Sequence, residues 1–432
     1  MESDLLTQVF YSRRQFIKGD YMNDVENKSR RHIKKPELLA PAGDLEKLKI
    51  AILYGADAVF IGGKDFSLRA RASNFSIDDI TEAVNFAKQH GVKIFVTTNI
   101  IPHNDNIRDY ERYLKDLSRA GVSAVICADP YFIEIATRVV PDMEVHISTQ
   151  QSITNSEAIN FWADEGVSRV VLGRELTIEE IKNVKKKSRA DIEVFIHGGM
   201  CSSYSGRCTL SNNMTERDAN RGGCAHSCRW NYKMFSKADD QLSSKDVSYS
   251  FSSKDLMAIN HLPALIEAGV DSLKIEGRMK SIHYIATVVG TYRKLIDDYC
   301  DAPDQLTDLT PYLDEISKAE NRLTAEGFLS GKPTDHEQLY NMRSEKPTQE
   351  FIALVLDYDP ITQLATIEQR NHFTKGESVE FFGPQFTHID YTIETIYDKD
   401  MTEIDVARHP RQILYIKLPF TVKPFDIMRK KR

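Results

Sequence analysis

From Pro36 to about residue 300, the chain alternates short apolar runs with amphipathic segments, and this rhythm constrains its fold more than any other feature. The apolar runs are ELLAPAG from Glu37, AVFIGG from Ala58, VKIFVTTN from Val92, AVICADP from Ala124, EVHISTQ from Glu144, RVVLGRE from Arg169, EVFIHGG from Glu193 and SLKIEGR from Ser272. Most intervening segments carry apolar residues at spacings of three and four, and many end in glycine, as amphipathic helices do. Eight such units predict a (β/α)8 barrel of the TIM type, with a doubly wound open sheet as the competing fold.

The polar residues that end these runs are candidates for an active site, because a TIM barrel builds its site from the carboxyl ends of the strands. Arginine pairs bidentately with carboxylates, so arginines at this end indicate an anionic substrate. The alternative role for them is salt bridging to Glu175 or Glu276 around the rim. The predicted substrate contacts are Arg69, Arg71, Asn99, Gln150, Arg174 and Arg278.

Three further residues at or near strand ends are predicted to take part in catalysis. His146 and His197 lie inside or at the end of predicted strands, and Glu276 ends the eighth run. Histidine transfers protons near neutral pH when it faces a reacting group. The alternative for each histidine is a hydrogen-bonded position in the core.

Four of the six cysteines gather between Cys201 and Cys228, with the spacing C-x6-C-x15-C-x3-C. The first thirty residues lack the apolar core of a secretory signal, so we expect a cytoplasmic protein, in which clustered cysteines bind metal or do redox chemistry. Zinc ribbons usually have two tight cysteine pairs, whereas only Cys224 and Cys228 are close here. This favours an iron–sulfur cluster over zinc and leaves unligated cysteines open. His197 ends a predicted strand, so the cysteines lie on a loop at the catalytic face.

The chain is predicted to fold as two domains behind a flexible leader. Residues 1–34 are polar and aperiodic, and Met22 is an alternative start. The barrel is expected over residues 35–345, with a cysteine-rich loop at 198–235. From 348 to 432 the pattern changes to a period of two with turn residues between the runs, which predicts a small all-β barrel. A net charge of -7 excludes a uniformly basic surface, so any nucleic-acid contact depends on local patches.

Several motifs resemble those of the collagenase-like peptidase family, a U-type family whose mechanism is unassigned. EVFIHGGMCSSYSGRCTLS, from Glu193 to Ser211, is similar to the signature of that family. ELLAPAGDLEKLKIAILYGADAVFIGG, HISTQQSITN, RGGCAHSCRW and LKIEGRMKS also match its pattern, in the same order. The resemblance covers roughly residues 36–300, and the β module beyond it is typical of longer members.

Within this family, the chain is most similar to the members that hydroxylate tRNA. That resemblance implies prephenate-dependent 5-hydroxylation of the wobble uridine of tRNA, which gives 5-hydroxyuridine. It also implies a 4Fe-4S cluster, with Cys201, Cys208, Cys224 and Cys228 as its ligands. The expected partner is the tRNA anticodon stem-loop, with the C-terminal module as a clamp for the stem. A homologous partner subunit is a further possible partner.

Peptidase activity is the alternative function. The sequence has no H-E-x-x-H zinc helix and no G-x-S-x-G elbow. A cysteine nucleophile needs a histidine base, and Cys201 with His197 or Cys224 with His226 would supply one. A lone nucleophile does not explain four gathered cysteines, however. A third interpretation is a cluster-bearing partner in the hydroxylation of a small aromatic molecule.

Overall fold

A computed structural model describes residues 33–68, 74–243, 248–319, 322–339 and 348–432. The chain divides into two units, residues 1–34 and residues 35–432. Nearly all of the predicted leader therefore lies outside the described residues, as do Arg69 and Arg71. No helix among the described residues is long and apolar enough to cross a membrane.

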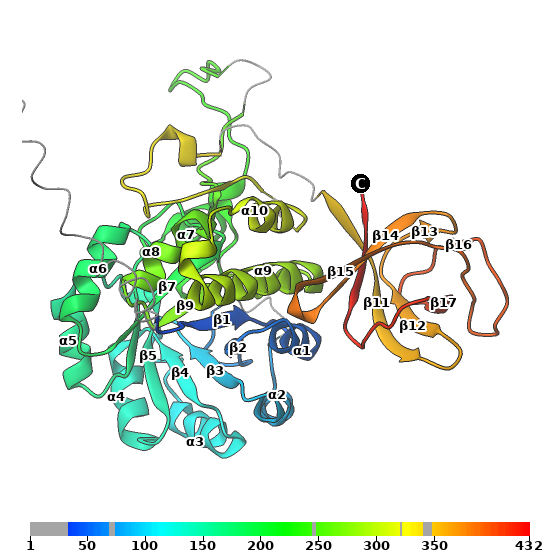
Figure 1. The fold of residues 1–432 in the computed structure, drawn as a ribbon. Coiled ribbons are helices and arrows are strands. Elements are labelled where there is room, and N and C mark those ends of the chain that lie inside the picture. The colour runs from blue at the N-terminus through cyan, green and yellow to red at the C-terminus, as the bar shows by residue number, and fades with distance from the viewer. Residues whose placement is uncertain (1–32, 69–73, 244–247, 320–321, 340–347) are drawn as a thin grey trace, which may run out of the picture. The chain divides into compact units, whose positions relative to one another are not determined.

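Eight parallel strands close into a barrel, which confirms the predicted TIM-like fold (Figure 1). The strands follow one another in chain order, and the last closes the barrel by pairing with both the first and the seventh. Each strand coincides with one of the eight apolar runs of the sequence, except that β7 begins two residues before its run. The barrel strands are β1 (Glu37–Pro41), β2 (Ala58–Gly62), β3 (Lys93–Thr98), β4 (Ala124–Cys127), β5 (Glu144–Ile147), β6 (Arg169–Val171), β7 (Asp191–Gly198) and β9 (Ser272–Ile275).

Helices connect the strands and lie outside them (Figure 1). Polar N-cap side chains start several of them: Ser76 and Thr177 each form a full capping box, which satisfies backbone N–H groups that the helix itself leaves unpaired. Gly121 ends one helix with φ of 83°, a conformation that favours glycine. The helices are α1 (Leu45–Leu53), α2 (Ile77–Gln89), α3 (Tyr110–Ala120), α4 (Pro130–Val139), α5 (Ser156–Asp164), α6 (Ile178–Lys187), α7 (Leu210–Thr215, within the cysteine loop), α8 (Leu262–Glu267), α9 (Ile282–Asp301) and α10 (Thr310–Ser317).

Two short strands, which the sequence pattern did not predict, extend the barrel sheet beyond β7. Strand β8 (Asp255–Met257) runs antiparallel to the carboxyl end of β7, where His197 is opposite Met257. Strand β10 (Thr324–Ala325) then pairs parallel with β8. Strands of three and two residues are too short to show a period of two, so only the fold reveals them.

The C-terminal part is an antiparallel all-β domain, as predicted. Its larger sheet has the strand order β15-β14-β18-β11-β12-β17, and β13 pairs with β16 in a second sheet. Alternate residues of these strands face one apolar core that includes Ile352, Phe373 and Phe381. The strands are β11 (Gln349–Asp359), β12 (Leu364–Gln369), β13 (Phe373–Thr374), β14 (Ser378–Gly383), β15 (Thr387–Thr392), β16 (Val406–Ala407), β17 (Ile413–Lys417) and β18 (Ile427–Lys431).

A buried arginine ties this domain to the barrel. Arg429 of β18 is fully buried, and its guanidinium donates to Glu315 of α10 at 2.7 Å and to Glu380 at 2.6 Å. Burying a charge is costly unless it is paired, so the two carboxylates are what allow Arg429 to sit there.

Candidate functional site

A cavity of about 530 Å³ opens at the carboxyl ends of the barrel strands. Its lining combines strand-end residues with the long loop that follows β7, and all four clustered cysteines belong to it. The volume lies in the range of pockets that bind small molecules. The predicted position of the cysteine loop, on the face where TIM barrels place their active sites, therefore agrees with the structure.

The ends of β5 and β6 hold this loop in place. Glu175 accepts two hydrogen bonds from Ser205, one from its backbone N–H at 2.8 Å and one from its hydroxyl at 2.9 Å. The backbone N–H of Arg174 donates to the Ser205 hydroxyl at 3.2 Å. Gly206 follows with φ of 73°, and a Cβ at that position would overlap the carbonyl oxygen of Gln150. The loop is thus anchored between its first two cysteines.

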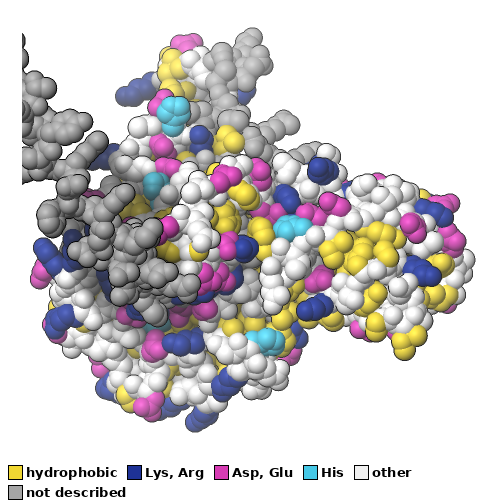
Figure 2. All heavy atoms as spheres, in the orientation of Figure 1, with side chains coloured by type: hydrophobic (Ala, Val, Ile, Leu, Met, Phe, Trp, Pro, Cys, Tyr) yellow, Lys and Arg dark blue, Asp and Glu magenta, His cyan; other side chains and the backbone are white. Residues whose placement is uncertain are grey.

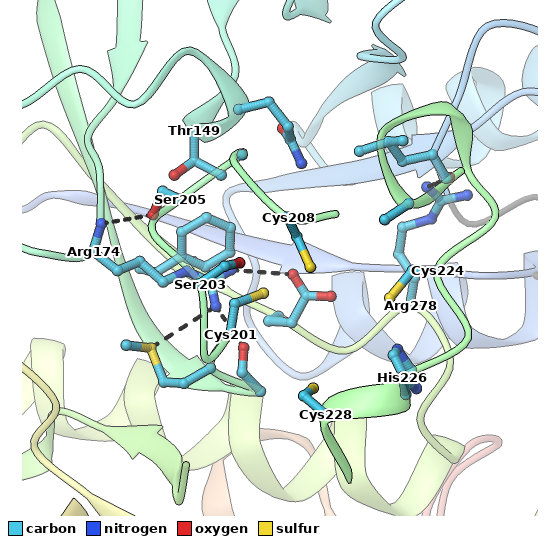
Figure 3. A pocket seen from close by; sticks show the side chains of 18 of the residues that line it. Thr149, Arg174, Cys201, Ser203, Ser205, Cys208, Cys224, His226, Cys228 and Arg278 are labelled. Atoms are coloured by element: carbon cyan, nitrogen blue, oxygen red, sulfur yellow. Dashed lines mark hydrogen bonds and ion pairs between the residues drawn. The ribbon is translucent and has the colours of Figure 1, made fainter. Parts of the chain in front are cut away.

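The four cysteines of the loop are free thiols, and their sulfurs point into a common space (Figure 3). A single zinc ion binds each thiolate at about 2.3 Å, which requires sulfurs roughly 4 Å apart. Among the described residues, no group of three or more Cys, His, Asp or Glu side chains is placed to hold one metal ion. Four thiols that line one cavity are the donor set that an iron–sulfur cluster uses.

The surroundings of the sulfurs fit such a group. The Ser211 hydroxyl contacts the Cys224 sulfur at 3.9 Å and accepts from the backbone N–H of Ala225 at 3.1 Å. The Asn220 amide donates to the Cys208 carbonyl at 3.1 Å. Burial raises the pKa of Cys228, and the neighbouring Cys201 adds to this rise. Hydrogen bonds to ligand sulfurs and partial burial are features that tune bound iron–sulfur clusters.

Among the predicted substrate contacts, Arg174 lines the cavity and forms the rim salt bridge that the sequence left open as an alternative. Its guanidinium lies 3.5 Å from Glu276, stacks 3.8 Å from the ring centre of Phe195 and donates to the Gly199 carbonyl. Because Glu276 also lines the cavity, the two predicted site residues neutralise each other.

Arg278 also lines the cavity, but its guanidinium binds the loop that follows β2. It donates to the Ser67 hydroxyl at 3.1 Å and to the Leu68 carbonyl at 3.0 Å, and it also reaches Asn74. A Cβ at Gly62 would overlap this guanidinium, so glycine is required where strand β2 ends. Arg278 therefore shapes one wall of the cavity.

Asn99 and Gln150 lie together in the cavity wall. The Asn99 amide donates to Gln150 Oε1 at 3.2 Å and to the Ser148 hydroxyl at 3.4 Å, while its own oxygen accepts from the backbone N–H of Leu68 at 3.2 Å. Both residues are thus brought together as strand-end position predicted, and they present amide groups to whatever occupies the cavity.

His146 is buried among the barrel strands and His197 is buried against α9, and neither lines the cavity wall. His146 bonds to Glu144 at 2.9 Å and packs edge-on against Phe95. His197 shares a hydrogen bond with the Tyr292 hydroxyl at 3.3 Å. These are the hydrogen-bonded core positions that the sequence left open as the alternative. Proton transfer by either residue stays a prediction.

His197 is expected to make the fold sensitive to acid. Burial, assisted by Lys280, lowers the pKa of His197 to about 3, whereas an unfolded histidine has a pKa of about 6.5. Its contribution to stability is therefore complete above pH 6.5 and is lost as pH falls towards 3. Urea unfolding midpoints between pH 7.5 and 5.5 should decrease less steeply in His197→Asn, which keeps a partner for Tyr292. Equal slopes in the two proteins would contradict this.

Sequence reasoning missed a set of charged residues that line another part of the cavity. Arg229, Lys280 and Arg322 line it around the buried carboxylate of Asp255. Asp255 belongs to β8, and its backbone N–H donates to the Leu323 carbonyl just before β10, so the two unpredicted strands assemble this wall. Lys280 lies within the motif LKIEGRMKS and Arg229 within RGGCAHSCRW, but nothing in the sequence relates Asp255 to Arg322.

Comparison with known proteins gives consistent matches along the chain. The model of peptidase family U32 matches residues 43–339, and that of the peptidase family U32 C-terminal domain matches residues 347–429. A tRNA hydroxylation protein P1 of Bacillus subtilis is 52% identical over 95% of this chain and 99% of its own length. A 23S rRNA 5-hydroxycytidine C2501 synthase of Escherichia coli is 44% identical over 60% of this chain and 39% of its own length. A collagenase of Porphyromonas gingivalis is 31% identical over 68% of this chain and 74% of its own length.

Proposed function

The chain belongs to peptidase family U32, and we propose that it is an RNA-modifying member that hydroxylates C5 of the wobble uridine of tRNA. The reaction uses prephenate as cosubstrate and a 4Fe-4S cluster held by Cys201, Cys208, Cys224 and Cys228. The observation that carries the proposal is the convergence of these four thiols on one cavity, in a chain 52% identical to a tRNA hydroxylation protein over nearly its whole length.

When bound, the cluster supplies one-electron redox chemistry at the cavity. The chain's own residues provide the rest of the site. Asn99 and Gln150 offer amide groups that are suited to hydrogen bonding with a uracil ring. The Arg174–Glu276 pair fixes the rim, and Glu175 holds the cysteine loop over the cavity. A target base must leave its stack to enter such a pocket, and the bases of an anticodon loop are already unstacked from a duplex.

The surface that meets tRNA is proposed to include an aromatic arm, defined as residues 230–243 and 248–251. On the face that Figure 2 shows, Lys and Arg side chains are interspersed with Asp and Glu and do not form one basic face. In the arm, Tyr232, Tyr249 and Phe251 pack with ring centres 5.3 to 6.0 Å apart. Trp230 and Phe251 are 42% and 45% exposed. Exposed rings beside a nucleotide-sized cavity are a means of stacking splayed bases.

Nucleoside analysis tests the proposed reaction directly. Total tRNA from a strain that lacks this gene should contain no 5-hydroxyuridine or products derived from it, and the wild-type gene on a plasmid should restore them. Mass spectrometry of digested tRNA measures both. Unchanged wobble uridine in the complemented strain, in a host that makes prephenate, would contradict the proposal.

Trp230→Ala is expected to weaken binding of the tRNA anticodon stem-loop. Stacking of one base on an aromatic ring contributes about 1–3 kcal/mol, so the dissociation constant should rise roughly 5- to 150-fold. Filter binding at a fixed salt concentration measures it, with iron content checked in parallel. Phe161→Ala is the matched control, because Phe161 is 57% exposed but lies on α5, away from the arm. Equal affinities of the two variants would exclude the arm from the interface.

Peptide hydrolysis is the alternative activity, since the collagenase of Porphyromonas gingivalis is a relative. In that case, His197 would serve Cys201 as a base, or His226 would serve Cys224. His197 instead shares a hydrogen bond with Tyr292 and does not line the cavity, whereas His226 and Cys224 both line it. A collagen-derived peptide incubated with the iron-loaded protein distinguishes the functions: cleavage that is lost in Cys201→Ser would support the peptidase.

A further inference from the structure

Three cations surround one carboxylate on the cavity wall built by β8 and β10. Arg322 lies 3.2 Å from Asp255, and Lys280 lies 3.8 Å from the other oxygen of the same carboxylate. A Cβ at Gly199 would lie 2.9 Å from Arg229 Nη2 and 3.8 Å from Asp255 Oδ1, so Arg229 reaches the same spot. We call Arg229, Lys280 and Arg322 the cation cluster.

The cation cluster carries more positive charge than its protein partners neutralise. Among the described residues, the three cations stand around the single carboxylate of Asp255, and nearby Glu276, which also acts on Lys280, pairs with Arg174. No carboxylate of the described residues lies within ion-pairing distance of the Arg229 guanidinium. Burial lowers the pKa of Lys280, and repulsion from Arg322 and Arg229 lowers it further. Partly buried, mutually repelling cations that line a cavity favour an anion there.

The four cysteines are the alternative anionic partner of these cations, since thiolates that hold an iron–sulfur cluster are negatively charged. Arg229 interacts with Cys228 and Cys201 and partly serves that purpose. Lys280 has Asp255, Arg322, Arg229 and Glu276 as its main electrostatic neighbours, and no cysteine is among them. Lys280 and Arg322 can therefore form ion pairs with an anionic ligand.

We propose that the cation cluster binds the two carboxylates of a small dicarboxylate cosubstrate beside the cysteines. The inference rests on the proposed function and names the residues that recognise the anionic cosubstrate. It adds three residues to the predicted arginines, of which Arg174 is engaged by Glu276 and Arg278 by the loop after β2. Guanidinium groups match the planar geometry of carboxylates, and the cation cluster has positive charge beyond what Asp255 neutralises.

The cavity and the exposure of the cluster favour a small molecule over an RNA backbone. The Lys280 and Arg322 side chains are 23% and 24% exposed, so their charged ends are reachable but recessed. A cavity of about 530 Å³ holds a ligand of about the size of a substituted ring. Phosphates of a folded RNA remain outside such a space, where contacts are sensitive to salt.

Calorimetry on the anaerobically purified, iron-loaded protein tests this site. The probes are prephenate, with two carboxylates, and phenylpyruvate, with one on a similar ring. The wild type should prefer prephenate. Arg322→Gln and Lys280→Met should each bind prephenate about 10- to 100-fold more weakly, the value of one charge-assisted contact, and lose the preference. Iron content and the visible spectrum should not change. Arg189→Gln is the matched control, since Arg189 forms an exposed pair with Asp164 at 2.6 Å, outside the cavity.

Two results would overturn the inference. In one, Arg322→Gln and Lys280→Met lose iron, which would mean that the cation cluster serves as counter-charge for the cysteines. In the other, both variants bind prephenate as the wild type does. Either result leaves the proposed function intact if 5-hydroxyuridine still depends on this gene. Conversely, selective dicarboxylate binding without any tRNA modification would support the site and reject the function.

Discussion

Replacing Cys208 with alanine is expected to remove bound iron and to abolish 5-hydroxyuridine in tRNA while the barrel stays folded. An iron–sulfur cluster of this type uses four thiolates, and the remaining three leave one iron without a protein ligand. Cys208 is partly exposed on the loop and contributes little packing, so unfolding is not expected. Because the redox centre is lost outright, the expected loss of product is at least about 100-fold, larger than that for any wall residue.

The measurement is anaerobic purification followed by iron and sulfide assays, a visible spectrum and nucleoside analysis of tRNA from the complemented strain. The wild type should be brown, with about four irons per chain. Cys300→Ala is the matched control, because Cys300 is a partly exposed cysteine of α9 that does not line the cavity. A colourless wild type with stoichiometric zinc, or a Cys208→Ala protein that keeps its iron and activity, would reject the cluster and favour the peptidase.

The barrel is predictable from the sequence because its strands are buried on both faces. Runs such as AVFIGG and AVICADP are almost entirely apolar, and β2 and β4 within them are buried at every position. Most runs are followed by helical periodicity, so the number and order of the strands are encoded locally. The all-β domain is predictable for a similar reason, since β12 alternates buried and half-buried residues.

Only part of the site can be predicted from the sequence. Residues within one local motif are recognised, whereas residues that meet from distant parts of the chain are not. The cysteines and the strand-end residues Asn99, Gln150 and Arg174 are recognised from local motifs. Asp255 and Arg322, by contrast, are 67 residues apart and meet only because β10 pairs with β8. Residue type also does not show whether a side chain is free to bind a ligand or is already hydrogen-bonded within the protein. Arg278 stands at the predicted strand end, yet hydrogen bonds to residues more than 200 positions away use its guanidinium. The local sequence pattern predicts that a side chain lies at the cavity. Its hydrogen-bond and ion-pair partners, however, are set by how distant segments meet in the closed barrel.

Glu193→Gln is expected to cause the largest loss of stability of any single change considered. Glu193 is fully buried in β7, and its carboxylate holds Lys274 at 2.7 Å and Arg169 at 3.3 Å. Burial alone would raise the pKa of Glu193, but the two cations outweigh it and lower that pKa to about 2. The amide cannot compensate them, and removing one partner of a buried ion pair costs about 3–5 kcal/mol. The contribution is complete above the unfolded pKa of about 4.3 and is lost as pH falls towards 2.

Urea unfolding at pH 7.5 measures this effect, and a second variant isolates its cause. Glu193→Gln combined with Lys274→Met leaves only Arg169, which also pairs with Glu37, so the double variant should recover part of the loss. The control is Asp164→Asn, which breaks the exposed pair with Arg189 and should cost less than about 1 kcal/mol. A Glu193→Gln protein as stable as Asp164→Asn would mean that water reaches the barrel interior and screens Lys274. In that case the cavity would extend below Lys274, and the barrel floor would be part of the site.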